Sequence, residues 1–154
     1  MNYHYSKGWF RAKKKALSLY TEEQAEKLHK AKKLYCVIVG NIEKPFAIID
    51  INNDFYGVSF FDEHLRATLD YHFVIQENDK LFLEMATYRE FIGSNDKPQC
   101  GTSYIFSTSG KVRIRKQDFN INELLESESQ TNVDSNWESI PEFGSYESLL
   151  KIER

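Results

Sequence analysis

The feature of this sequence that most constrains its fold is a run of short apolar or alternating segments between residues 35 and 117, separated by turn-forming clusters. The clearest segment is 111–117, in which Val112 and Ile114 alternate with cationic residues. Alternation of period two places one set of side chains on each face of a strand. Short turns favour antiparallel neighbours, because parallel strands need long crossovers. The pattern therefore predicts a twisted antiparallel β-meander of six or seven strands.

Turn clusters rich in Asn, Asp, Gly and Ser divide this region into its predicted strands. These strands are 35–39, 46–51, 55–61, 65–76, 80–92, 102–107 and 111–117. Segment 80–92 also fits a helical period, with Leu81, Glu84, Met85 and Tyr88 three or four residues apart. A partly helical structure therefore stays open for this segment.

Two helices are predicted outside the sheet. Thr21 is a favourable N-cap, and Gln24 stands three residues later, which is the spacing of a capping box. A helix should follow over residues 22–33. Asn120 can cap a second, shorter helix over residues 121–128.

The final segment, 137–152, follows a polar stretch and is again rich in large apolar residues, so we expect it to dock on the sheet. Together these elements predict a single α+β domain over residues 1–154. Its parts are an N-terminal arm (1–18), a helix (19–34), an antiparallel sheet (35–117) and an acidic C-terminal region (118–154) packed back.

Length and composition favour one globular domain in the cytoplasm. The chain has 154 residues, of which 41% are hydrophobic and 14% aromatic, so a core is expected and disorder is not. No apolar run approaches the ~20 residues of a membrane helix, and residues 1–12 lack the apolar core of a secretory signal. We expect Cys36 and Cys100 to be free thiols, as in most unsecreted proteins.

Charge is distributed unevenly along the chain. Residues 1–33 hold nine Lys or Arg against three Glu, whereas residues 118–154 hold nine Asp or Glu against two basic residues. The two ends could neutralise each other in the fold, or the acidic end could meet a basic partner.

The sequence carries no recognisable catalytic, cofactor or metal motif. There is no phosphate-binding loop, dinucleotide fingerprint or nucleophile elbow, and neither cysteine has the spacing of a zinc site. We therefore expect no enzyme activity and no cofactor.

One face of the predicted sheet could still serve a small ligand or a reaction. On segment 65–76, Asp70 and His72 share a face, and on segment 80–92 Glu84 and Glu90 are expected on one face with Phe82 and Tyr88. If the register brought these residues to Arg113 and Arg115, the face would combine imidazole, carboxylates and guanidinium groups. The alternative is a solvated sheet face with cross-strand ion pairs.

The N-terminal arm interleaves aromatic and basic residues, as in Trp9, Phe10 and Arg11, which could stack bases and hold phosphates. The chain's pI of about 5.8 makes a solvated arm the favoured interpretation and nucleic acid an unlikely partner. The aromatic residues Tyr56, Phe60 and Phe61, with those of the tail, instead suggest a surface for a protein partner.

The sequence resembles the small cytosolic immunity proteins of bacterial polymorphic-toxin systems. The resemblance lies in Tyr104-Ile-Phe-Ser-Thr-Ser-Gly followed by Lys111-Val-Arg-Ile-Arg, and in the ending Trp137-Glu-Ser-Ile-Pro-Glu-Phe-Gly-Ser-Tyr-Glu-Ser-Leu-Leu. It implies a non-enzymatic role, in which the chain binds a cognate protein toxin and blocks its active site. An acidic surface would suit a nuclease toxin, whose own site attracts phosphates.

Three functions remain open on the sequence: a toxin-binding immunity protein, a small-ligand binder or enzyme around His72, Glu84 and Arg113, and a subunit that pairs with itself through a strand edge. The candidate partner-binding residues are Tyr56, Asp70, His72, Glu84, Tyr88, Glu90, Arg113, Arg115, Trp137 and Glu138. The identity of the partner and the oligomeric state are not specified.

Overall fold

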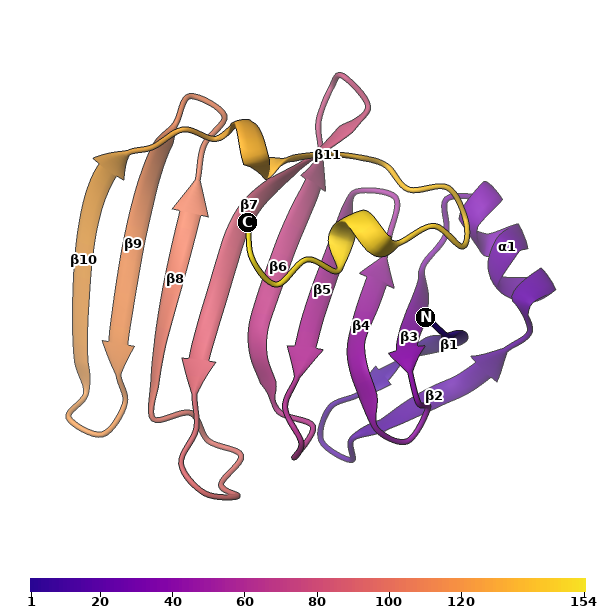
Figure 1. The fold of residues 1–154 in the computed structure, drawn as a ribbon, viewed down its shortest axis with the longest axis horizontal. Helices are drawn as coiled ribbons and strands as arrows, with labels where there is room; N and C mark the ends of the chain where they lie inside the picture. Colours follow the sequence, from indigo (N-terminus) through magenta and orange to yellow (C-terminus); the bar gives the residue numbers. More distant parts are fainter.

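Ten of the strands form one antiparallel path, in the order β10-β9-β8-β7-β6-β5-β4-β3-β1-β2, and the eleventh strand pairs beside β7 (Figure 1). The computed structural model describes all of residues 1–154. The strands are β1 (Tyr3–Phe10), β2 (Lys15–Tyr20), β3 (Tyr35–Gly40), β4 (Pro45–Ile51), β5 (Phe55–Phe61), β6 (Ala67–Ile75), β7 (Lys80–Glu90), β8 (Cys100–Phe106), β9 (Lys111–Asp118), β10 (Glu123–Gln130) and β11 (Trp137–Ser139). From β3 to β10 each strand pairs with its neighbour in sequence, so the predicted meander is confirmed.

The helix α1 (Glu22–Lys30) begins where its capping box predicted. The Thr21 side chain accepts a hydrogen bond from the Gln24 backbone N–H at 3.1 Å, and the Gln24 side chain accepts one from the Thr21 N–H at 2.9 Å. The helix ends at Lys30, three residues before the predicted end. Two short 3-10 helices follow near the C-terminus, η1 (Asp134–Asn136) and η2 (Glu147–Leu149).

Three sequence-based predictions about the elements are wrong. The fold is mainly β with eleven strands, not α+β with six or seven. The predicted solvated arm, residues 1–18, belongs instead to the β1–β2 hairpin, which runs from Tyr3 to Tyr20 and buries the rings of Tyr5 and Trp9. Residues 121–128 do not form a helix, since this stretch pairs with β9 as the edge strand β10.

The predicted helical alternative for segment 80–92 is also excluded. The whole of β7 is extended, and it pairs with β6 on one side and with β8 and β11 on the other. A bulge interrupts it, because His72 lies opposite Met85 whereas Phe73 lies opposite Leu83. Alternation therefore changes phase at Glu84.

The C-terminal segment (residues 131–154) crosses the front face of the sheet, the face turned to the viewer in Figure 1, as predicted for a docked tail. The main core lies beneath this segment and α1. Tyr35, Phe73, Leu81, Tyr146 and Leu149 are among its fully buried members. Burial of this apolar area is the main stabilising contribution to the fold.

A smaller core lies on the back face. After Ser6, β1 no longer pairs with β3, and Trp9 comes to lie against Cys36, Ile38 and Ile48. Both faces of β3 and β4 are therefore covered, which is why these strands read as nearly continuous apolar runs. No helix of the structure has the length and apolar character needed to cross a membrane.

Candidate functional site

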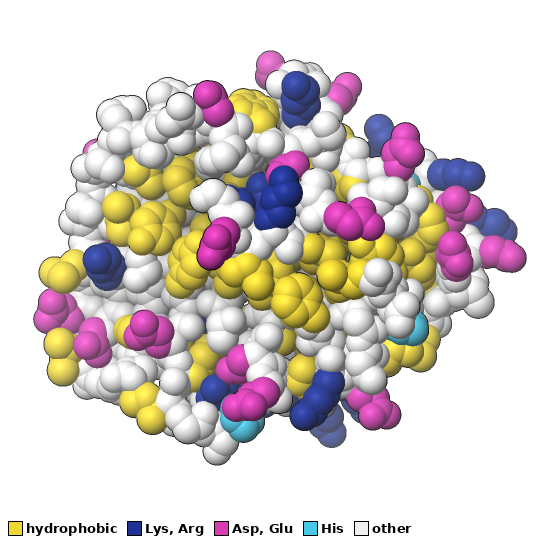
Figure 2. All heavy atoms as spheres, in the orientation of Figure 1, with side chains coloured by type: hydrophobic (Ala, Val, Ile, Leu, Met, Phe, Trp, Pro, Cys, Tyr) yellow, Lys and Arg dark blue, Asp and Glu magenta, His cyan; other side chains and the backbone are white.

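The front face of β8–β10, with the adjoining half of β7, is the part of the sheet that the C-terminal segment borders but covers least, and we call it the open basin. Figure 2, drawn in the orientation of Figure 1, shows hydrophobic side chains gathered there beside the tail. The basin encloses a hollow of about 410 Å³. Its apolar lining is Tyr71, Leu83, Ala86, Tyr88, Tyr104, Phe106, Val112 and Ile114.

The register of the strands builds this surface row by row. Tyr71, Ala86, Tyr104 and Ile114 lie directly opposite one another on four successive strands, so their side chains share the front face. Tyr104 also contacts Tyr88 edge to face, with ring centroids 5.9 Å apart. The basin is therefore an ordered aromatic platform carried by hydrogen-bonded strands.

Apolar side chains remain exposed at the basin and beyond its outer side. Tyr88 is 43% exposed and Leu125, on the edge strand β10, is 58% exposed. Exposed residues near the same outer strands also include Ile92, Phe119 and Ile121, whereas Leu124 lies on the back face of β10. Contiguous exposed apolar patches on a protein surface mark interaction sites.

Carboxylates border one end of the basin. Glu90, Cys100, Asp118 and Glu123 lie opposite one another in a single front-face row, and Figure 2 shows acidic side chains towards the lower left. The Cys100 thiol donates a hydrogen bond to Glu90 at 2.8 Å, which together with nearby negative charge raises the pKa of Cys100. At the tail side, the Arg154 guanidinium is bound to Glu138 at 2.8 Å.

A second concavity, the basic cleft, opens on the back face. It measures about 580 Å³ and lies between the β1–β2 turn, the β5–β6 turn and the β7–β8 loop. Its charged lining residues are Arg11, Lys14, Arg66, Asp70, Arg89 and Asp96, and its apolar lining residues are Trp9, Ala12, Phe61, Leu65, Ala67, Phe91 and Pro98.

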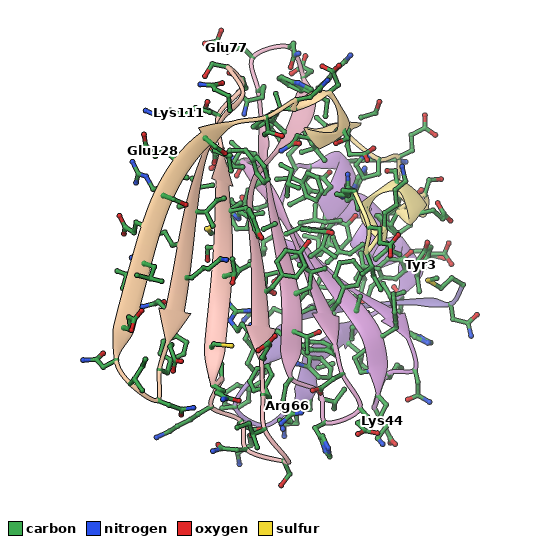
Figure 3. All side chains as sticks on the ribbon, turned by 60° about the vertical axis from the view of Figure 1, so that its left-hand side comes forward. Tyr3, Lys44, Arg66, Glu77, Lys111 and Glu128 are labelled. Atoms are coloured by element: carbon green, nitrogen blue, oxygen red, sulfur yellow. The ribbon has the colours of Figure 1, made fainter.

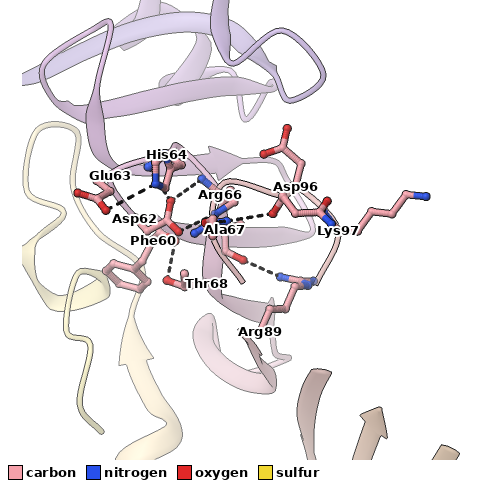
Figure 4. Close-up of polar contacts among 12 residues, drawn as sticks. Phe60, Asp62, Glu63, His64, Arg66, Ala67, Thr68, Arg89, Asp96 and Lys97 are labelled. Atoms are coloured by element: carbon pink, nitrogen blue, oxygen red, sulfur yellow. Dashed lines mark hydrogen bonds and ion pairs between the residues drawn. The ribbon is translucent and has the colours of Figure 1, made fainter. Parts of the chain in front are cut away.

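Arg66 joins two walls of the basic cleft. Its Nε donates to Asp62 at 2.8 Å (Figure 4), and its Nη1 donates to the backbone carbonyls of Gly93 and Asn95. Its guanidinium also lies 4.6 Å from the ring centroid of Phe91. Hydrogen bonds from Arg66 hold the pKa of Asp62 below its usual range, against the opposing effect of partial burial.

Asp70 connects two further arginines at the base of the cleft. It accepts a hydrogen bond from Ser59 at 2.5 Å and forms an ion pair with Arg89, while Arg11 donates to the Ser59 hydroxyl at 3.0 Å. Arg11 also lies 3.9 Å from Asp50. Burial raises the pKa of Asp50, and the nearby Arg11 charge opposes that effect.

The sequence-predicted site residues do not form one site. Asp70, His72, Arg113 and Arg115 share the back face, but Tyr88 and Glu90 lie on the front face. Glu84 is the exposed extra residue of the β7 bulge. The expectation that Glu84 and Glu90 share a face with both Phe82 and Tyr88 is wrong, because the bulge places Phe82 and Tyr88 on opposite faces.

The remaining predicted residues have structural contacts. Tyr56 is buried in the main core, and Trp137 packs edge to face against Phe82 at 4.8 Å between centroids. Glu138 is held by Arg154 and by Lys151. These contacts give Tyr56, Trp137 and Glu138 structural roles that require no ligand.

His72 and Arg113 occupy one back-face row, but Met85 and Ile105 stand between them. Three strand spacings separate their backbones by about 14 Å. Arg115 forms an ion pair with Glu126 at 3.1 Å. At the outer edge Lys111 forms an ion pair with Glu128 at 3.4 Å, and Figure 3 shows the side chains of Lys111 and Glu128. This half of the back face matches the solvated, ion-paired alternative.

Sequence reasoning missed the residues that the structure brings together. Arg89 was not singled out, and Arg11 was considered only for nucleic acid. Tyr104, Ile114 and Leu125 were assigned to elements but not to a binding surface. Aligning the predicted strands 102–107 and 111–117 as a hairpin would have placed Tyr104 opposite Ile114. Directly opposite residues share a face of the sheet.

Comparison of the chain with protein-family models, curated proteins and solved structures gave no match. No group of three or more His, Cys, Asp or Glu side chains is arranged to hold a metal ion.

Proposed function

We propose that this chain is a non-enzymatic, cytoplasmic protein-binding module, an immunity protein that binds and neutralises a cognate bacterial toxin through the open basin. The observation that carries the proposal is the front face of β8–β10 and the adjoining half of β7. There an aromatic surface continues the covered core, and the C-terminal segment borders it through residues such as Asn132 and Arg154 while Tyr88, Tyr104 and Phe106 keep exposed surface.

The chemistry of the basin favours a protein partner. Tyrosine and other aromatic residues are enriched at the centres of protein interfaces, where they bury large areas with few rotatable bonds. Tyr88, Tyr104 and Phe106 supply such a centre, and the β-sheet holds them in fixed positions. Little ordering is then required on binding.

The charges at the border indicate the kind of partner. Glu90, Asp118 and Glu123 place negative charge at one end of the basin, so a protein with a basic rim is complementary. A toxin that acts on nucleic acid carries such a basic surface around its active site.

The proposal is tested with the reading frame immediately upstream of the gene. Its product is expressed in bacteria with or without this chain, and growth is measured. We expect the wild-type chain to restore growth and to bind the purified product. Leu125→Glu and Tyr88→Ala should each weaken binding at least ~10-fold, as at interface positions that contribute strongly to affinity.

Leu19→Glu is the matched control. Leu19 is exposed to a similar degree as Leu125 but lies on β2, at the opposite edge of the sheet. A product whose toxicity the chain does not relieve, or a complex that Leu19→Glu weakens as much as Leu125→Glu does, would contradict the proposal. Light scattering that showed a dimer broken by Leu125→Glu would instead assign the basin to a second copy of the chain.

A further inference from the structure

The basic cleft holds more hydrogen-bond donors than the protein itself satisfies. A guanidinium has five N–H donors. Arg11 donates one hydrogen bond, to Ser59, and Arg89 donates through Nη1 alone, to Asp70 and to the Ala67 carbonyl. Both side chains line the cleft and are partly exposed, at 53% and 32%. Their remaining N–H groups have no protein acceptor.

These two arginines are held close together by shared partners. Asp70 binds Arg89 directly and is linked to Arg11 through the Ser59 hydroxyl. One carboxylate therefore lies between two guanidinium groups, and the next carboxylate, Asp50, is 3.9 Å from Arg11. Ser59 and Asp70 thus link two guanidinium groups in one cleft, and such planar donors match the oxygens of a phosphate or carboxylate.

The walls of the cleft are fixed before any ligand arrives. Lys14 ties the β1–β2 turn to Asp96 at 2.8 Å and to the His64 carbonyl at 2.9 Å. Arg66 ties the β5–β6 turn to the β7–β8 loop through the backbone carbonyls of Gly93 and Asn95. A preformed site loses less conformational entropy when it binds.

The apolar part of the lining adds a second kind of contact. Phe61, Leu65 and Phe91 line the same hollow as the arginines, and Trp9, also in the lining, packs against Phe61 with ring centroids 5.6 Å apart. A volume of about 580 Å³ lies within the range of ~300–1,000 Å³ of small-molecule sites. The lining thus combines oxyanion donors with an apolar wall.

We propose that the basic cleft binds a small organic anion, whose phosphate or carboxylate accepts hydrogen bonds from Arg11 and Arg89 while its apolar body lies against Phe61, Leu65 and Phe91. The cleft lies on the back face and the open basin on the front, so this site does not depend on the proposed toxin-binding function.

The test is calorimetric titration of the full chain with 1-naphthyl phosphate, 1-naphthoate, inorganic phosphate and the uncharged 1-naphthalenemethanol. We expect at least one naphthyl anion to bind with a Kd below ~1 mM and at least ~10-fold more tightly than either inorganic phosphate or the alcohol. The ratio of the two naphthyl affinities distinguishes a phosphate site from a carboxylate site.

Two variants and a control locate the binding. Arg11→Met and Lys14→Met remove partly exposed cations at the cleft, and Arg113→Met removes a cation on the same face outside it. We expect Arg11→Met to weaken binding at least ~10-fold, Lys14→Met to weaken it less, and Arg113→Met to change it less than ~2-fold. Raising the salt concentration from 50 to 200 mM should also weaken binding of the anion.

The proposal is overturned if neither naphthyl anion binds at 10 mM, or if the alcohol binds as tightly as the anions. It is also overturned if inorganic phosphate binds as tightly as naphthyl phosphate, because the apolar wall would then contribute nothing. Equal affinities of Arg11→Met and the wild type, with circular dichroism showing both folded, would place any binding elsewhere.

Discussion

The two halves of the sheet share one hydrogen-bonded architecture but differ in what covers them. In β3 five of six residues are buried and none is exposed, whereas all eight residues of β10 are exposed. The β3–β7 half has the C-terminal segment and α1 on its front, and the β1–β2 hairpin covers part of its back. The β8–β10 half has neither.

This difference separates stability from binding. Apolar burial, which contributes most of the free energy of folding, is concentrated in the β3–β7 half. The β8–β10 half depends on strand pairing and on cross-strand ion pairs such as Arg115–Glu126. A partner can therefore dock on the open basin without displacing the core, and substitutions at its exposed positions, such as Tyr88 and Leu125, can be tested with little risk of unfolding.

The largest contrast should appear in the reactivity of the two thiols. Cys36 is fully buried in the back-face core beneath Trp9, whereas Cys100 lies at the border of the open basin. Cys36 can react only when the protein opens, so we expect its labelling by a maleimide at pH 8 to be at least ~10³-fold slower. Mass spectrometry of native and urea-unfolded protein measures this difference.

Cys100→Ser is the control for this experiment, and it should leave the native protein almost unlabelled. Fast labelling of Cys36 in that variant would show that the β1–β2 hairpin opens readily, and the back of the β3–β7 half would then not be securely covered.

Truncation of one tail residue should destabilise the protein far more than truncation of a basin residue. Tyr146 is fully buried, and its hydroxyl lies 3.0 Å from that of Tyr35. We expect Tyr146→Ala to lower the free energy of unfolding by ~3–5 kcal/mol, as for other large core side chains. Leu125→Ala, on exposed β10, should lower it by less than ~0.5 kcal/mol. Urea denaturation measures both, and similar losses would contradict the division into halves.

Removal of the helix cap should have an intermediate effect. Thr21→Ala deletes the hydroxyl that accepts from Gln24, and we expect a loss of ~1 kcal/mol in urea denaturation. Thr21→Ser keeps the acceptor and should be nearly neutral. Helix α1 covers the main core through Ala25 and Leu28, so a loss of zero would mean that the helix contributes little to covering the β3–β7 half.

The smallest expected effect concerns pH. Burial lowers the pKa of His29, with nearby Glu26 opposing the shift, and its Nδ1 lies 2.8 Å from the Tyr35 hydroxyl. The unfolded chain takes up this proton first on acidification, so the stability contribution is complete above about pH 6.5. It is lost as the pH falls through the lowered native pKa.

His29→Gln should therefore flatten the dependence of unfolding free energy on pH between 7 and 5, as measured by urea denaturation at several pH values. An unchanged slope in the variant would show that another group is responsible for the pH dependence in this range.

The sequence predicted best those elements whose signals are local or whose strands are buried. Both hydrogen bonds of the capping box at Thr21 lie within four residues of the chain. Hairpin turns such as 108–110 likewise depend on the Ser and Gly residues within the turn. Strand β10 was missed because none of its side chains is buried, so its sequence has no apolar period. Its Glu residues favour helix in isolation, but pairing with the cations of β9 overrides that preference.

The candidate sites were harder to predict because they depend on register. The bulge in β7, where the register shifts between His72 and Phe73, places Glu90 and Asp70 on opposite faces of the sheet. Strict alternation had grouped these two residues on one face. The basic cleft combines three turns distant in sequence, and its key ion pair, Asp70–Arg89, joins two strands. No spacing in the sequence marks such a site.

The pairing of β11 has a consequence for shortened forms of this protein. β8 pairs with residues 85–90 of β7, and β11 pairs with residues 80–82 of the same strand. Proteolysis before residue 131 would remove β11 and leave the backbone of residues 80–82, in the middle of the sheet, with unsatisfied hydrogen-bonding groups. It would also remove Trp137 and so expose the ring of Phe82. We expect such a fragment to aggregate, so minimal versions for crystallisation or fusion should retain the tail and be shortened elsewhere, if at all.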